Sequence, residues 1–216
     1  MDSTQLLQVF REEMADMAEP YLWSDSAIYR YADEAHKWFH RWTEGIEDAT
    51  SGFTQLAVTP GVELFTLSPL ILKLRYARRA DNGRPVEIMS IEKAAQSGVL
   101  LGQRTGQVTH LITGESKGKV RVWPTPSETV TIKLGTFRLP EAAIDGPGVE
   151  FELDDQHHLA LLDWMRHLAY SRHDAETLNV KLADTHGALF RSYCEKAKVE
   201  QNRARHPAGA VMYGGI

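Results

Sequence analysis

The chain has 216 residues, 43% of them hydrophobic, and a formal net charge of −5 at pH 7. That length can bury a sizeable core in one large domain or two small ones. The single cysteine, Cys194, excludes a disulfide framework and favours a reducing compartment. Apolar runs such as residues 98–101 are far shorter than the ~18 residues of a membrane span. The first residues resemble no signal peptide, so we expect synthesis in the cytoplasm and no membrane partner.

Charge is distributed unevenly along the chain. Residues 1–50 contain 11 acidic and 4 basic residues, whereas residues 70–140 contain 12 basic and 5 acidic residues. The basic segment could face nucleic acid, the acidic parts of its own chain, or a neighbouring subunit. Aromatic residues are not interleaved among the basic ones, which argues against sequence-specific DNA recognition.

Two helices are expected at the start of the chain. Apolar side chains at helical spacing over residues 6–17 predict the first helix, which Pro20 stops. Either Ser24 or Asp25 can cap the N-terminus of the second helix, whose apolar stripe covers residues 28–42. We therefore assign residues 1–50 to helices.

Between residues 51 and 149 the hydrophobic period changes to that of strands. Short, partly alternating runs bounded by glycine-rich and Pro-Gly turns predict antiparallel strands. These runs are residues 53–58, 64–67, 71–76, 108–112, 119–123 and 130–134. Residues 87–96 are ambiguous, since Ile88, Ile91 and Ala95 could line a short helix over the sheet. Strands without long helices between them indicate a sandwich or a small barrel.

Helical periodicity returns in residues 150–200, where two helices are expected, over residues 154–170 and from Asp174 to about Lys198. The second of these is predicted to bury Leu178, Leu182, Thr185, Leu189 and Tyr193. We expect the N-terminal and C-terminal helices to form one bundle. The predicted fold class is therefore α+β, with an antiparallel β domain inserted into a helical bundle.

Residues 201–216 are predicted to form an extended C-terminal arm. This segment has no acidic residue, and its glycines keep it pliable. A segment that no core can use can fold onto a partner as it binds, although a merely disordered terminus is the alternative. The candidate docking residues of the arm are Arg203, Arg205, His206, Val211, Met212, Tyr213 and Ile216.

Residues 114–118 match Gly-x-Ser-x-Gly, the nucleophile elbow of serine hydrolases. That chemistry needs a strand, a sharp turn and then a helix, so that the serine lies beside oxyanion-stabilising N–H groups. Here the following segment, residues 119–123, is predicted to be another strand. We therefore interpret Ser116 as a hairpin-turn residue and expect no catalytic site.

Two pairs of possible metal ligands occur at helical spacing. His36 and His40 are four residues apart, and so are Asp163 and His167, so each pair shares a helix face. A metal ion prefers three or more such groups, and no third ligand stands out in the sequence. We interpret these histidines as solvated or interfacial. The chain also lacks a phosphate-binding Gly-Lys-Ser loop and a dinucleotide fingerprint, so no cofactor is expected.

Several motifs follow one another in a particular order. Tyr21-Leu22-Trp23-Ser24-Asp25 leads into a helix that contains Tyr31-Ala32-Asp33-Glu34-Ala35. A β segment then ends in Val120-Arg121-Val122-Trp123-Pro124-Thr125-Pro126, and a helix from Leu159 to Tyr170 follows, before Asp174. In this order the motifs resemble the head-to-tail adaptor (connector) proteins of tailed bacteriophages, over about residues 20–195.

The resemblance implies a structural virion protein at the head–tail junction, and not an enzyme. Such a protein would form a homo-oligomeric ring of twelve copies beneath the portal protein. The ring would lengthen the channel for DNA ejection, let DNA pass without sequence-specific binding, and provide a platform for the tail tube or nozzle protein. The arm would dock on the portal. Two alternatives remain open, a DNA-binding accessory protein that uses the basic β domain and a hydrolase that uses Ser116.

Overall fold

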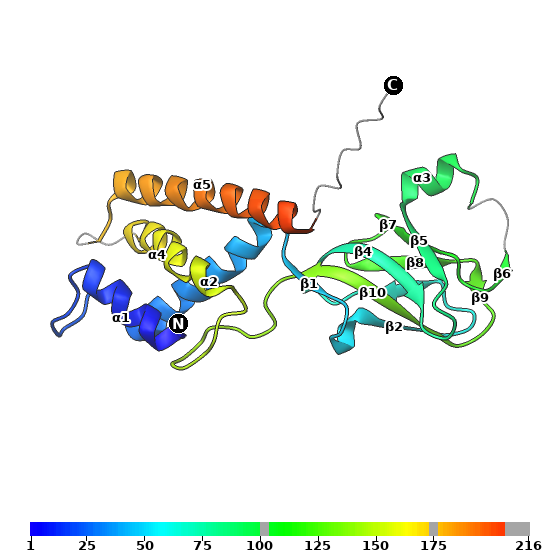
Figure 1. Ribbon diagram of the computed structural model, residues 1–216, viewed down its shortest axis with the longest axis horizontal. Coiled ribbons are helices and arrows are strands. Elements are labelled where there is room, and N and C mark those ends of the chain that lie inside the picture. The colour runs from blue at the N-terminus through cyan, green and yellow to red at the C-terminus, as the bar shows by residue number, and fades with distance from the viewer. Residues whose placement is uncertain (100–103, 173–176, 206–216) are drawn as a thin grey trace, which may run out of the picture. The chain divides into compact units, whose positions relative to one another are not determined.

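The computed structural model describes residues 1–99, 104–172 and 177–205. The chain divides into two compact units, a helical unit of Met1–Glu44 with Pro140–Ile216 and a β unit of Gly45–Leu139 (Figure 1). The α+β class expected from the sequence is confirmed. The β unit begins earlier than residue 51 and ends earlier than residue 149, because the short acidic strand at residues 46–48 belongs to it and Ile144 is buried in the helical core.

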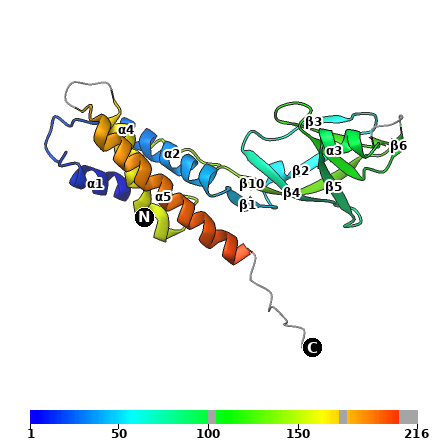
Figure 2. The same cartoon turned by 90° about the horizontal axis from the view of Figure 1, so that it is seen from above.

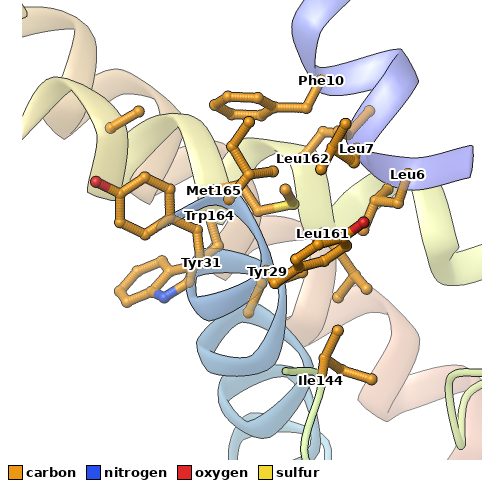
Figure 3. Close-up of a cluster of buried hydrophobic side chains, with 14 of the residues drawn as sticks. Leu6, Leu7, Phe10, Tyr29, Tyr31, Ile144, Leu161, Leu162, Trp164 and Met165 are labelled. Atoms are coloured by element: carbon orange, nitrogen blue, oxygen red, sulfur yellow. The ribbon is translucent and has the colours of Figure 1, made fainter. Parts of the chain in front are cut away.

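In the helical unit, side chains from both ends of the chain share one buried cluster. Its described elements are α1 (Ser3–Glu13), α2 (Asp25–Trp42), the 3-10 helix η2 (Asp155–Ala160), α4 (Leu161–Tyr170) and α5 (Val180–Arg205). Helix α4 contacts both α2 and α5, and Figure 2 shows α5 passing in front of α4 with α2 beside them. Figure 3 shows Leu6, Leu7 and Phe10 of α1 gathered with Leu161, Leu162 and Met165 of α4.

The first helix is shorter than predicted. Asp2 and Gln5 form a capping box at its start, and it ends at Glu13 and not near residue 17. The chain reverses because Ala15 adopts a φ of 54° and Arg11 pairs with Asp16 at 2.7 Å. The predicted cap of α2 is confirmed, since Ser24 accepts a hydrogen bond from the backbone N–H of Ala27.

The prediction of which face of the last helix is buried is wrong. Leu178, Leu182 and Leu189 are 45%, 38% and 51% exposed. The face that is buried consists of Ala183, Gly187, Phe190, Cys194 and Ala197. Small residues at three- and four-residue spacing let two helices approach closely. A side chain at Gly187 would meet the ring of His167 on α4 at 3.0 Å, so this glycine marks the close approach.

Helix α5 also extends beyond the predicted boundary at residue 200. Residues 201–205 are helical, so the extended arm does not begin at Gln201. The reason lies in the sequence, because no glycine or proline interrupts residues 188–205 and the last residues include good helix formers. At the other end, the predicted helix over residues 154–170 starts with a 3-10 turn, η2, before it continues as α4.

The β unit contains a curled sheet around its own apolar cluster (Figure 1). Its strands are β1 (Ile46–Asp48), β2 (Gln55–Val58), β3 (Leu64–Thr66), β4 (Ile71–Arg79), β5 (Pro85–Ser90), β6 (Thr105–Gly106), β7 (His110–Thr113), β8 (Lys119–Trp123), β9 (Thr125–Pro126) and β10 (Val130–Arg138). The sheet order is β1-β10-β4-β5-β7-β8-β3, with β2 also paired to β10, and β6 and β9 form a separate pair. A 3-10 turn, η1 (Gly52–Thr54), precedes β2.

The expectation of a wholly antiparallel domain is wrong in two places. Strands β5 and β7 are parallel, and so are β6 and β9. Parallel neighbours need a crossover connection, and the chain between β5 and β7 includes the short helix α3 (Ile91–Gln96). The ambiguous segment 87–96 therefore divides, with its first part in β5 and its second in α3, where the Ser90 hydroxyl accepts a hydrogen bond from the N–H of Lys93.

Candidate docking sites

The described part of the predicted arm is the last turn of α5. Arg203 is exposed, whereas the Arg205 side chain is only 13% exposed and lies 3.8 Å from the Glu44 carboxylate. Lys198 reaches the same carboxylate at 3.0 Å. These contacts hold the end of α5 against Glu44, two residues after the end of α2. The contacts with Glu44 therefore define the position of Arg205, and the remaining residues of the arm follow directly after it.

The other candidate docking residues lie outside the described residues. They are His206, Val211, Met212, Tyr213 and Ile216. Their role stays a prediction from the sequence.

The Leu22-Trp23-Ser24-Asp25 motif has a structural role. The Arg11 guanidinium donates hydrogen bonds to Asp16 and, at 3.0 Å, to the carbonyl of Trp23, and it also pairs with Asp25. Asp16 in turn accepts a hydrogen bond from the N–H of Leu22 at 2.8 Å. The Trp23 ring meets Phe10 edge to face, with centroids 5.9 Å apart. The motif therefore fastens α1 to the start of α2.

The Val120–Pro126 motif holds the end of the sheet together. Val120 and Val122 are buried, while Arg121 pairs with Glu115 in the preceding turn and with Glu63 before β3. The Thr125 hydroxyl donates to the same Glu63 carboxylate at 2.6 Å. These contacts explain the motif as a connection between β8, the turn before it and β3.

The β unit neutralises much of its own positive charge. It contains 12 basic and 8 acidic residues. Arg79 is buried and pairs with Asp81 and Glu128 at 2.7 and 2.9 Å. Arg138 pairs with Asp48 at 2.7 Å in a buried contact. The charges of these arginines are therefore engaged by the unit itself and do not form a free basic surface.

The Asp48 carboxylate shows how strongly one of these pairs is held. Burial by itself raises the pKa of Asp48, but hydrogen bonds from Ser51, Thr50 and Arg138 outweigh burial and hold that pKa well below its usual range. Asp48 stays ionised at any neutral pH, so the ion pair of β1 with β10 persists.

Ser116 lies in the turn between the antiparallel strands β7 and β8, as predicted. The backbone N–H of Lys119 bonds to the carbonyl of Ser116 at 3.2 Å, which closes the turn. A strand, and not a helix, follows. The arrangement that a nucleophile elbow needs is therefore missing at this serine.

The interpretation of His36 and His40 as solvated or interfacial is wrong. Their side chains are buried, and the two rings lie 5.0 Å apart. The apolar residues of the stripe on α2 draw both rings into the core. Burial lowers the pKa of His36 to about 4, so its ring is neutral at pH 7.

The side chains of the second pair, Asp163 and His167, have different partners. Asp163 accepts from His186 on α5 at 2.9 Å, whereas His167 bonds to the carbonyl of Ala183 at 2.8 Å. Across residues 1–99, 104–172 and 177–205, no three His, Cys, Asp or Glu side chains gather to hold a metal ion. Sequence reasoning missed that His157 and His158 are buried as well, because consecutive histidines give no periodic signal.

In both units, buried ion pairs fasten neighbouring segments to one another. None of the described helices is long and apolar enough to cross a membrane. A family model described as SU10 adaptor protein matches residues 1–212, and the chain belongs to this family. The resemblance to phage head-to-tail adaptors is thereby confirmed, and the family is one of structural adaptors and not of enzymes. No curated protein matches the chain.

Proposed function

We propose that the chain is one subunit of a homo-oligomeric ring at the head–tail junction of a phage virion, between the portal protein and the tail. Membership of the adaptor family is the observation that carries this proposal. The number of copies is proposed to be twelve, and the helices from both ends of the chain act as one bundle within each copy. Rings form by heterologous contacts, in which one face of a subunit meets a different face of the next.

The charges of the two units support such contacts. The helical unit contains 12 basic and 21 acidic residues, whereas the β unit contains more basic than acidic residues. The two units therefore carry net charges of opposite sign, which can attract a neighbouring copy. The ring would extend the DNA channel and provide the platform for the tail tube or nozzle protein, and DNA would pass through it without sequence-specific binding.

The arm is proposed to dock on the portal. Arg203 is exposed at the end of α5, where it can meet acidic groups, and Val211, Met212 and Tyr213 supply apolar anchors. A good aromatic anchor commonly contributes about 2 kcal/mol or more to binding. Repetition around a ring multiplies such contributions through avidity.

Deletion of residues 206–216 tests the arm. Because Lys198 and Arg205 keep their contacts with Glu44, circular dichroism and melting should remain almost unchanged. Attachment to portal-bearing heads should be lost, which would give filled heads that leak DNA and lack tails. The measurement is co-sedimentation with DNA-filled heads, and negative-stain images of the protein with the portal show whether a ring forms.

A matched control keeps the length of the arm and replaces Val211, Met212, Tyr213 and Ile216 with serine. If this variant fails to attach as the deletion does, the apolar anchors carry the binding. If the chain that lacks residues 206–216 co-sediments with heads as well as the full-length chain does, the docking surface lies on the folded body. The proposed role of the arm is then wrong.

A further inference from the structure

A groove of about 950 Å³ lies in the β unit beside the first half of β4. Residues 71–74 form one wall, and the turn between β7 and β8, which contains Ser116, forms part of the other. The apolar lining comes from Leu67, Pro69, Ile71, Leu72, Leu74 and Ile88. Leu72 is 37% exposed, so apolar surface is accessible in it. Grooves of this volume and lining are typical of sites that take up a ligand or a short segment of chain.

The part of β4 that lines the groove belongs to a strand edge that is paired over only part of its length. Strand β4 pairs with β10 along its whole length, from Ile71 to Arg79. Its pairing with β5 covers only Ala77 and Arg78, because β5 then pairs with β7. Among the strands that the structure describes, residues 71–76 thus have a partner on one side only. The backbone groups of such an edge can pair with an added strand.

The charge around the groove is positive. Lys73, Lys117 and Lys119 line it, and none of its described lining residues is acidic. The carboxylate in the same turn, Glu115, is bound by Arg121 and does not line the groove. Lysines on an exposed strand edge can have another role, which is to prevent aggregation with the edges of other sheets. That role requires no apolar hollow beside the edge, whereas a binding groove does.

We propose that this groove binds an extended segment of another protein in which apolar and acidic residues alternate. The segment would add a strand to residues 71–76 of β4, place its apolar side chains against Leu72 and Leu74, and pair its carboxylates with the lysines. This site is separate from the proposed arm of residues 206–216. Its test does not depend on whether that arm binds the portal.

The probe is an acetylated nonapeptide of alternating glutamate and valine, compared with the same peptide in which lysine replaces glutamate. The full-length chain should bind the glutamate peptide at least tenfold more tightly at low salt, and added salt should reduce the difference. Saturation with the glutamate peptide should slow hydrogen exchange at the amides of residues 71–76. Fluorescence anisotropy and hydrogen–deuterium exchange measure the two effects.

Variants connect the binding to the groove. Lys117→Glu combined with Lys119→Glu should weaken binding of the glutamate peptide at least tenfold, and Leu72→Asp should weaken it similarly. The matched control is Lys133→Glu, since Lys133 is an exposed strand lysine on β10 outside the groove. It should leave binding unchanged. Circular dichroism checks folding, and the lysine variants alter only exposed side chains.

Two results would overturn the proposal. One is equal affinity for the two peptides, which would mean that the lysines recognise no charge. The other is unchanged exchange at residues 71–76 when the glutamate peptide is saturating, which would mean that no strand is added to β4.

Discussion

At the scale of single residues, the contact between α1 and α2 depends on one buried cation. The side chains of Arg11 and Asp16 are 7% and 3% exposed, and the same guanidinium bonds to the carbonyl of Trp23. A buried ion pair is costly to break, because the remaining charge is left without a partner. Arg11 therefore stabilises the Leu22-Trp23-Ser24-Asp25 motif, which is one of the motifs that resemble phage adaptors.

We predict that Arg11→Met lowers the free energy of unfolding of the helical unit by about 3–5 kcal/mol. Urea unfolding followed by tryptophan fluorescence measures the change, since four of the five tryptophans lie in this unit. The control is Lys37→Met, which removes a half-exposed ion pair with Asp33 and should cost less than about 1 kcal/mol. A loss below about 1 kcal/mol for Arg11→Met would contradict the assigned role.

The buried His36 ring makes stability depend on pH. The unfolded chain binds a proton at His36 near pH 6.5, whereas the folded chain does so only near pH 4. Between these values the unfolded state holds more protons, so stability falls as the pH falls. The shift corresponds to a loss of about 3 kcal/mol, which is complete once the pH falls below the lowered pKa of about 4. Burial lowers the pKa of His157 as well, which acts in the same direction.

We predict that His36→Phe reduces this loss. Urea midpoints of the wild type and the variant at pH 7.5, 5.5 and 4.5 measure the difference. His110→Phe, in the β unit, is the control and should keep the wild-type dependence of the urea midpoint of the helical unit on pH. If His36→Phe loses as much stability toward pH 4.5 as the wild type, the dependence arises from other groups.

At the scale of elements, α5 shows where hydrophobic periodicity misleads. The apolar stripe that the sequence predicts to be buried, which includes Leu182 and Leu189, is exposed. The stripe that packs contains Ala183, Gly187 and Ala197, whose small size permits close contact. Size and hydrophobicity predict burial only where the neighbouring helix leaves room for the side chain.

Two adjacent residues on α5 test its orientation. Phe190 is fully buried and its ring lies 5.5 Å from those of both Trp42 and Trp164. We predict that Phe190→Ala costs about 3–5 kcal/mol, because it leaves a cavity. Leu189→Ala should change stability by no more than about 0.5 kcal/mol, since Leu189 is 51% exposed. Thermal melting of both variants checks the order, and an inverted order would show that the predicted face is the packed one.

The predicted strands coincide with observed strands where apolar and polar residues alternate strongly. They differ where a strand is defined mainly by its pairing with a neighbouring strand. The run of residues 119–123 coincides with β8, and the run of residues 130–134 is the first half of β10. Strand β1 was missed because Ile46–Asp48 is short and acidic, and β5 because Pro85 begins it. Both strands exist because a neighbour pairs with them, which no local pattern records.

At the scale of the whole molecule, the net charge of −5 and the internal ion pairs of Arg79, Arg121 and Arg138 argue against strong binding of DNA. We predict that the full-length chain binds free duplex DNA only weakly, with a dissociation constant of about 10⁻⁶ M or higher at physiological salt and no dependence on sequence. Electrophoretic mobility shifts with two unrelated duplexes measure this. Nanomolar binding to one of them would support the DNA-binding alternative.

The sequence by itself determined the fold class, the approximate positions of most helices and strands, the turn character of Ser116 and the resemblance that the family match confirmed. Those features depend on local periodicity, caps, turn residues and ordered motifs, which neighbouring residues encode. Only the tertiary structure decided which face of α5 is buried, that His36 is neutral, and that β4 has a half-open edge beside an apolar groove. These properties arise from contacts between segments distant in the chain, so no stretch of sequence contains them.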